Sequence, residues 1–156
     1  MNKEEVLKHL GMGKTIHLEW MQKAKRLLKG GESSDKLAPI ESETCPFYRW
    51  FLTDGQRLSK LSNNPLTCMQ NIEKLHGEIH TIYNEMFKLC APSTNKEGLL
   101  GKLFSAKPKV LTAEELEIAQ TKLLELERVS NELIGEIERL ERRLGAVSDE
   151  KIASLE

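Results

Sequence analysis

The part of the chain after Thr112 carries the pattern that most limits how this sequence can fold. Apolar residues recur there every seven positions along two seams, over five heptads. One seam contains Leu116, Leu123, Ser130, Ile137 and Leu144, and the other contains Ala119, Leu126, Leu133, Leu140 and Val147. Seams spaced in this way are typical of a coiled coil. We therefore predict a coiled-coil helix over residues 112–147, which drives self-association because an isolated helix would expose both seams.

The chain before this helix also has helical periodicity. Apolar residues at helical spacing predict helices over residues 3–29, 44–61 and 65–90. Aromatic residues make up only 5% of the chain, which disfavours a β-sandwich. The predicted fold class is all-α, and the expected divisions are a helical bundle in residues 1–90, a linker in 91–111, the coiled-coil helix in 112–147 and a tail in 148–156.

The charge of the chain does not favour a nucleic-acid or membrane partner. Lys and Arg number 23 and Asp and Glu number 24, so the net charge is −1, which is too small to attract a polyanion. No apolar run approaches the roughly 18 to 20 residues that span a bilayer, and the first residues lack the apolar core of a signal peptide. We expect a cytoplasmic protein, in which the three cysteines stay reduced.

Two histidines lie four residues apart in the third predicted helix, in the sequence His76-Gly77-Glu78-Ile79-His80. This spacing places both imidazoles on one helical face, where they can bind a single metal ion. Zinc proteases use the same spacing, but they need a glutamate directly after the first histidine, and this chain has Gly77 there. Taken alone, the pair is weak evidence for a metal site, and ordinary histidines on an amphipathic helix are the more common explanation.

Cys45 and His17 are the other two candidate ligands. Cys45 lies at the start of the second predicted helix, where the helix dipole favours the thiolate that metals and oxidants prefer. The alternative for any lone cysteine is a small buried apolar side chain, which is our interpretation of Cys68 and Cys90. His17 lies in the middle of the first predicted helix, and a core or boundary histidine is the alternative there.

Helix lengths bring these four residues to one level of a bundle. At 1.5 Å per residue, His17 lies about 18 Å before the end of its helix, and the loop that follows is long enough to return the chain to that level. The next helix starts there with Cys45, and the third helix climbs back to His76 and His80. Four nitrogen and sulfur ligands suit tetrahedral zinc, and a complete set leaves no position for a substrate water.

The pattern resembles the chemoreceptor zinc-binding domain family of bacterial chemoreceptors and of enzymes that make cyclic di-GMP. The resemblance covers roughly residues 5–90 and is carried by three motifs: His17-Leu18-Glu19-Trp20, Cys45-Pro46-Phe47-Tyr48-Arg49-Trp50, and His76-Gly77-Glu78-Ile79-His80. Many members of the family have glycine where this chain has Tyr48. The resemblance implies an antiparallel four-helix bundle, a zinc site of three histidines and one cysteine, and usually a homodimer.

The function expected from this resemblance is signalling and not catalysis. Members of the family are thought to report zinc or hypochlorous acid to an attached domain, in chemotaxis or in cyclic di-GMP pathways. The sequence contains no cyclase motif, so we expect a stand-alone sensor that acts on a chemoreceptor or a diguanylate cyclase in trans. The main alternative is a structural zinc site in a coiled-coil dimerisation or adaptor protein. A metalloenzyme or di-iron carrier would need more ligands than converge here.

One further segment, residues 98–104, is apolar and is followed by lysines. We expect it to form a short linker helix that docks on the bundle, with contact to a membrane surface or a partner groove as the alternative.

Overall fold

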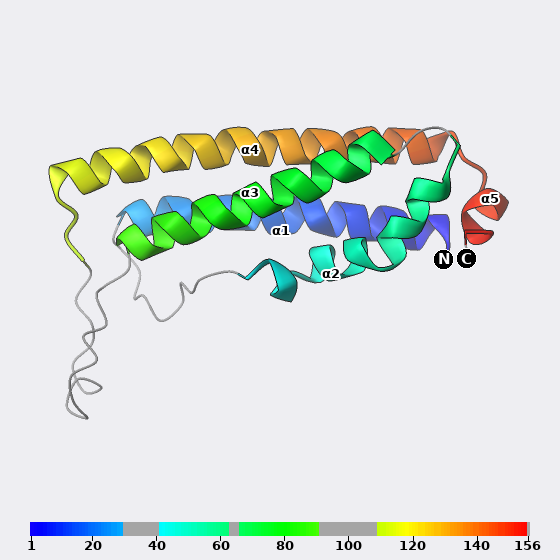
Figure 1. Ribbon diagram of the computed structural model, residues 1–156, viewed down its shortest axis with the longest axis horizontal. Helices are drawn as coiled ribbons and strands as arrows, with labels where there is room; N and C mark the ends of the chain where they lie inside the picture. The colour runs from blue at the N-terminus through cyan, green and yellow to red at the C-terminus, as the bar shows by residue number, and fades with distance from the viewer. Residues whose placement is uncertain (30–40, 63–65, 91–108, 156) are drawn as a thin grey trace, which may run out of the picture.

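The computed structural model describes residues 1–29, 41–62, 66–90 and 109–155, and the regular elements in these ranges are all helical (Figure 1). The α-helices are α1 (Lys3–Lys29), α2 (Pro46–Leu52), α3 (Leu66–Cys90), α4 (Ala113–Gly145) and α5 (Asp149–Ala153). Two 3-10 segments flank α2, namely η2 (Ser42–Thr44) and η3 (Asp54–Lys60). The prediction of an all-α bundle with a C-terminal helix is confirmed.

The long helices lie side by side, with α1 and α3 running in one direction and α4 in the opposite direction, and the two termini lie at the same end of the molecule (Figure 1). Lys3 at the start of α1 pairs with Asp149 of α5, and two ion pairs join α1 to α4, namely Lys14 with Glu141 and Lys25 with Glu127. In these two pairs, the higher number on α1 meets the lower number on α4. The two helices therefore pack antiparallel.

Both heptad seams of α4 are largely buried within the chain itself. Leu126, Leu133, Ile137, Leu140 and Leu144 are almost completely excluded from solvent, and α4 packs on α3 and on α1. We expected this helix to lie outside the bundle of residues 1–90 and to pair between subunits. The structure differs because a heptad seam requires a lengthwise helical partner but does not specify whether that partner belongs to another chain.

The second predicted helix is shorter than expected. It was predicted to run to about Leu61, but α2 ends at Leu52 and Thr53 leaves the helical conformation, with φ −107° and ψ −94°. The Thr53 hydroxyl donates hydrogen bonds to the carbonyl oxygens of Arg49 and Trp50, and such side-chain bonds compete with the helical ladder. The chain continues as η3, which buries Leu58 against the bundle.

The start of α4 is fixed by polar contacts to the end of α3. The Lys109 ammonium donates to the carbonyl oxygen of Leu89 and to Glu115, and Thr112 forms a reciprocal capping box with Glu115. The segment of residues 98–104 and most of the predicted linker lie outside the described residues. Within the described ranges, no helix is long and apolar enough to cross a membrane.

The burial of α4 within the chain can be tested by shortening one core side chain. Leu133→Ala should lower the free energy of unfolding by about 2–5 kcal/mol, because it leaves a cavity among three helices. Leu124→Ala is the matched control on the same helix, since Leu124 is 67% exposed, and should change it by less than about 0.5 kcal/mol. Urea unfolding followed by circular dichroism measures both. Equal effects of the two variants would contradict the described packing.

Candidate metal centre

His17 lies inside the bundle, midway along α1. Its side chain is fully buried, and its Nδ1 lies 2.5 Å from the carbonyl oxygen of Gly13, one turn earlier in the helix. A carbonyl oxygen can only accept, so Nδ1 carries the proton and Nε2 presents its lone pair. This buried Nε2 has no hydrogen-bond partner among the described residues. A buried acceptor without a partner is costly, and a metal ion would satisfy it.

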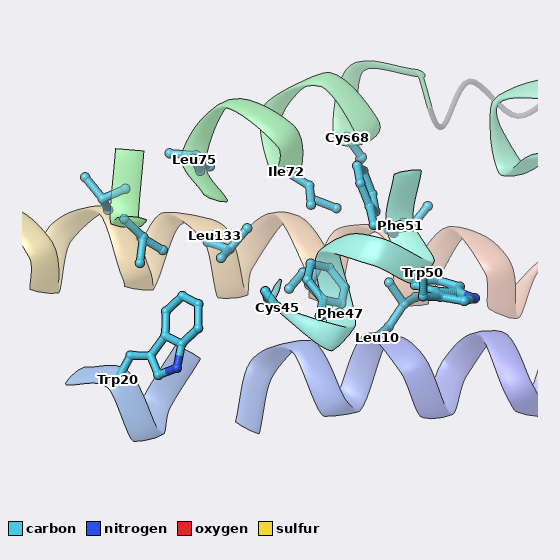
Figure 2. Close-up of a cluster of buried hydrophobic side chains, with 14 of the residues drawn as sticks. Leu10, Trp20, Cys45, Phe47, Trp50, Phe51, Cys68, Ile72, Leu75 and Leu133 are labelled. Atoms are coloured by element: carbon cyan, nitrogen blue, oxygen red, sulfur yellow. The ribbon is translucent and has the colours of Figure 1, made fainter. Parts of the chain in front are cut away.

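Gly13 allows the start of α2 to approach α1 closely. A Cβ atom at position 13 would lie 2.5 Å from Cδ2 of Phe47, which is shorter than any ordinary contact. The Phe47 ring also meets His17 edge-on, with 5.7 Å between the ring centroids. Figure 2 shows Phe47 beside Cys45 at the start of α2, above α1. The missing side chain at Gly13 therefore sets how near Cys45 comes to His17.

Cys45 is the N-cap residue of α2 and is 2% exposed. Burial raises the pKa of its thiol, while hydrogen bonds from the backbone amides of Tyr48 and Phe47 and the nearby charge of Arg49 lower it only in part. We expected the helix N-terminus to favour the thiolate at this position. The amides do lower the pKa of the thiol, but burial raises it by more. A cation is therefore needed to hold the sulfur as thiolate.

His76 and His80 project from successive turns of α3, as their spacing predicted. Their Nε2 atoms lie 3.2 Å apart. Two imidazole nitrogens bound to one tetrahedral zinc, each at 2.0–2.1 Å from it, would lie about 3.3 Å apart. The spacing of the two rings is thus already suitable for a shared metal ion.

Aromatic side chains enclose the pair of histidines. The Tyr48 ring stacks on the His76 ring, with 4.2 Å between centroids and 13° between planes. Trp20 meets His80 edge-on at 4.4 Å and His17 at 5.0 Å. From the sequence, Trp20 was named only as part of the first motif of the family resemblance, and Tyr48 only as a departure from the family pattern. The position of Trp20, three residues after His17, was the available signal that it lies beside the site.

The three elements bring three of the four candidate ligands into one group. The ligand atoms of His17, Cys45 and His76 lie within 4.8 Å of one another. This group does not include His80, which adjoins it through the contact of its Nε2 with that of His76. Burial, with a smaller contribution from neighbouring histidines, lowers the pKa of His17 to about 4 and that of His76 to about 2, and the hydrogen bond to Gly13 opposes this shift in part at His17. Neutral imidazoles with free lone pairs are the form that binds metals. The donor set of nitrogen and sulfur atoms therefore fits zinc.

Comparison with known proteins agrees with this geometry. Residues 17–87 match the family model of the chemoreceptor zinc-binding domain, so this segment is a domain of that family and the resemblance seen in the sequence is confirmed. The matched segment begins at the first candidate ligand and ends within α3. No curated protein and no solved structure matches the chain. The family is one of zinc-binding domains, whereas metal binding by these four residues stays a prediction.

The close contact at Gly13 can be tested against a second glycine of the same helix. Gly11→Ala should stabilise the protein by about 0.8–1 kcal/mol through helix propensity, because its Cβ would meet nothing within 4 Å. Gly13→Ala gains the same propensity but should destabilise the protein, since Phe47 must move. Chemical unfolding of both variants checks this. If Gly13→Ala stabilises the protein, the Phe47 ring moves aside at little cost in free energy.

Proposed function

We propose that this chain binds one zinc ion through His17, Cys45, His76 and His80 and acts as a regulatory module without catalytic activity. The observation that carries the proposal is the buried group of one thiol and three imidazoles, with the Nε2 of His17 unpartnered among the described residues. Catalytic zinc sites keep one position open for water, whereas four protein ligands close the coordination shell.

The placement of the site supports a sensing role. The four residues come from α1, the start of α2, and α3, so zinc would tie together three elements that otherwise meet through apolar contacts. Removing zinc would leave buried polar groups unsatisfied in the core, and this weakens the packing among those elements. We propose that the module reports zinc or hypochlorous acid in bacterial signalling, to a partner such as a chemoreceptor or a diguanylate cyclase.

A structural zinc site in an adaptor protein is the alternative. The burial of the ligands favours it, since a fully enclosed ion exchanges slowly. The affinity and exchange rate of zinc separate the two functions. A sensor must exchange its metal near cellular free-zinc levels, whereas a structural site stays filled under all conditions.

The zinc site can be tested with a double substitution on α3. The His76→Ala, His80→Ala variant should lose zinc binding, because two ligands cannot close a tetrahedral shell. His9→Ala is the matched control, since His9 stacks on Trp50, with 4.6 Å between the ring centroids, and is not one of the proposed ligands. Elemental analysis and competition with a zinc-binding dye give stoichiometry and affinity. Full zinc occupancy in the double variant would refute the assignment.

The oxidant hypothesis predicts which cysteine reacts. Hypochlorous acid converts a thiolate to sulfenic acid and releases chloride, and a sulfenic acid is a poor zinc ligand. Cys45 should therefore be modified first and zinc released in step, although Cys90 is the more exposed thiol at 9% against 2%. Mass spectrometry after brief exposure measures this, with zinc release followed in parallel. If Cys90 or Cys68 reacts first, or if Cys45 is oxidised with zinc retained, zinc supply becomes the signal.

A further inference from the structure

The metal centre comes nearest to solvent at His80. His17 and His76 are fully buried and Cys45 is 2% exposed, whereas His80 is 4% exposed and forms part of the wall of a surface cavity. This cavity has a volume of about 580 Å³, and its lining residues are Glu41, Ser42, Gly77, His80, Thr81 and Asn84. It adjoins the proposed zinc ligands and is large enough for a hydrated cation.

The lining of this cavity is polar on both sides. One wall is the outer face of α3, with the hydroxyl of Thr81 and the amide of Asn84. The other wall is the segment that leads into Cys45, whose amide donates a hydrogen bond to the carbonyl oxygen of Ser42 at 3.1 Å. The cavity is therefore lined by one proposed ligand, His80, and by Ser42, which lies three residues before a second proposed ligand, Cys45.

Glu41 supplies a negative charge at this cavity. Its side chain is exposed, and its carboxylate forms no ion pair with any described residue. An exposed carboxylate beside a polar depression raises the local concentration of cations and speeds their association.

Gly77 lies at the opening of the cavity and has no side chain that would narrow it. It is exposed on α3, and a Cβ atom built there would meet nothing within 4 Å. A larger residue could therefore be placed at the rim without a clash, and it would narrow the opening beside His80.

We propose that this cavity is the path by which the divalent cation reaches and leaves the buried centre, with Glu41 attracting the ion and His80 as the first ligand it meets. The inference rests on the proposed zinc site and adds to it the direction of access. A path of this kind governs the rates of binding and release and leaves the equilibrium affinity unchanged.

The main test narrows the opening with Gly77→Leu in the full chain. Stopped-flow mixing with zinc, and transfer of bound zinc to a chelator, measure association and release. Both rates should fall by about tenfold, which is a barrier higher by about 1.4 kcal/mol, with the dissociation constant unchanged. Gly135→Leu is the matched control, because Gly135 is also an exposed helical glycine with open space around it and lies on α4, away from this cavity.

A second variant tests the charge without changing the shape. Glu41→Gln should slow zinc association by about threefold at low ionic strength, and the difference should vanish at high salt. Glu73→Gln is its control, since Glu73 is exposed on α3 and does not line the cavity. It should bind zinc at the wild-type rate.

The outcomes distinguish the access path from the zinc site. Unchanged rates in Gly77→Leu, or a changed affinity with an unchanged association rate, would overturn the proposed path. So would equal effects of Glu41→Gln and Glu73→Gln. Absence of zinc binding by the unaltered protein at equilibrium would instead refute the proposed function itself, and it is measured before any rate.

Discussion

The fold is organised around a group of polar side chains that a helical bundle does not normally bury. Burial of three imidazoles and a thiol costs free energy unless each finds a partner, and here the protein supplies only some of the partners. The Gly13 carbonyl oxygen accepts a hydrogen bond from Nδ1 of His17, and the backbone amides of Phe47 and Tyr48 donate hydrogen bonds to the sulfur of Cys45. The lone pair of the His17 Nε2 has no such partner among the described residues. Under the proposed function, a cation would complete this core, and the apolar packing around it holds the candidate ligands in place.

The surrounding elements and aromatic side chains cover this group of imidazoles and thiol. α1, α2 and α3 supply the candidate ligands, while α4 closes the open side of the bundle through its apolar seams and through ion pairs along α1. Phe47, Tyr48 and Trp20 cover the imidazoles. Among the described residues, the cover is thinnest at His80, where Gly77, Glu41 and Ser42 help to line a cavity. The aromatic side chains therefore bury the candidate ligands, and the cavity beside His80 is where solvent comes nearest to them.

The long helices and the candidate ligands could be predicted from the sequence because both depend on local spacing, while metal binding by these residues stays a prediction. Histidines four apart share a helical face in any bundle, and helix lengths placed His17 and Cys45 at their level. Other features depend on contacts between distant residues. The heptad seams of α4 do not specify whether their partners lie in the same chain. The apolar periodicity continues to Leu61, so it did not show that α2 would end at Leu52. The stacking of Tyr48 on His76, and the balance by which burial outweighs the amides at Cys45, also required the packed structure.

The position of α4 limits how a change at the site could reach a partner. α4 is not a free tail, since Leu133, Ile137 and Leu140 are buried in the same core that encloses the candidate ligands. Ser130 interrupts one seam, and its buried hydroxyl has no partner among the described residues. Under the proposed function, loss of zinc would loosen α1 and α3, the two helices on which α4 rests. The signal would then be a change in how α4 packs on α1 and α3. This change would not require a separate output domain.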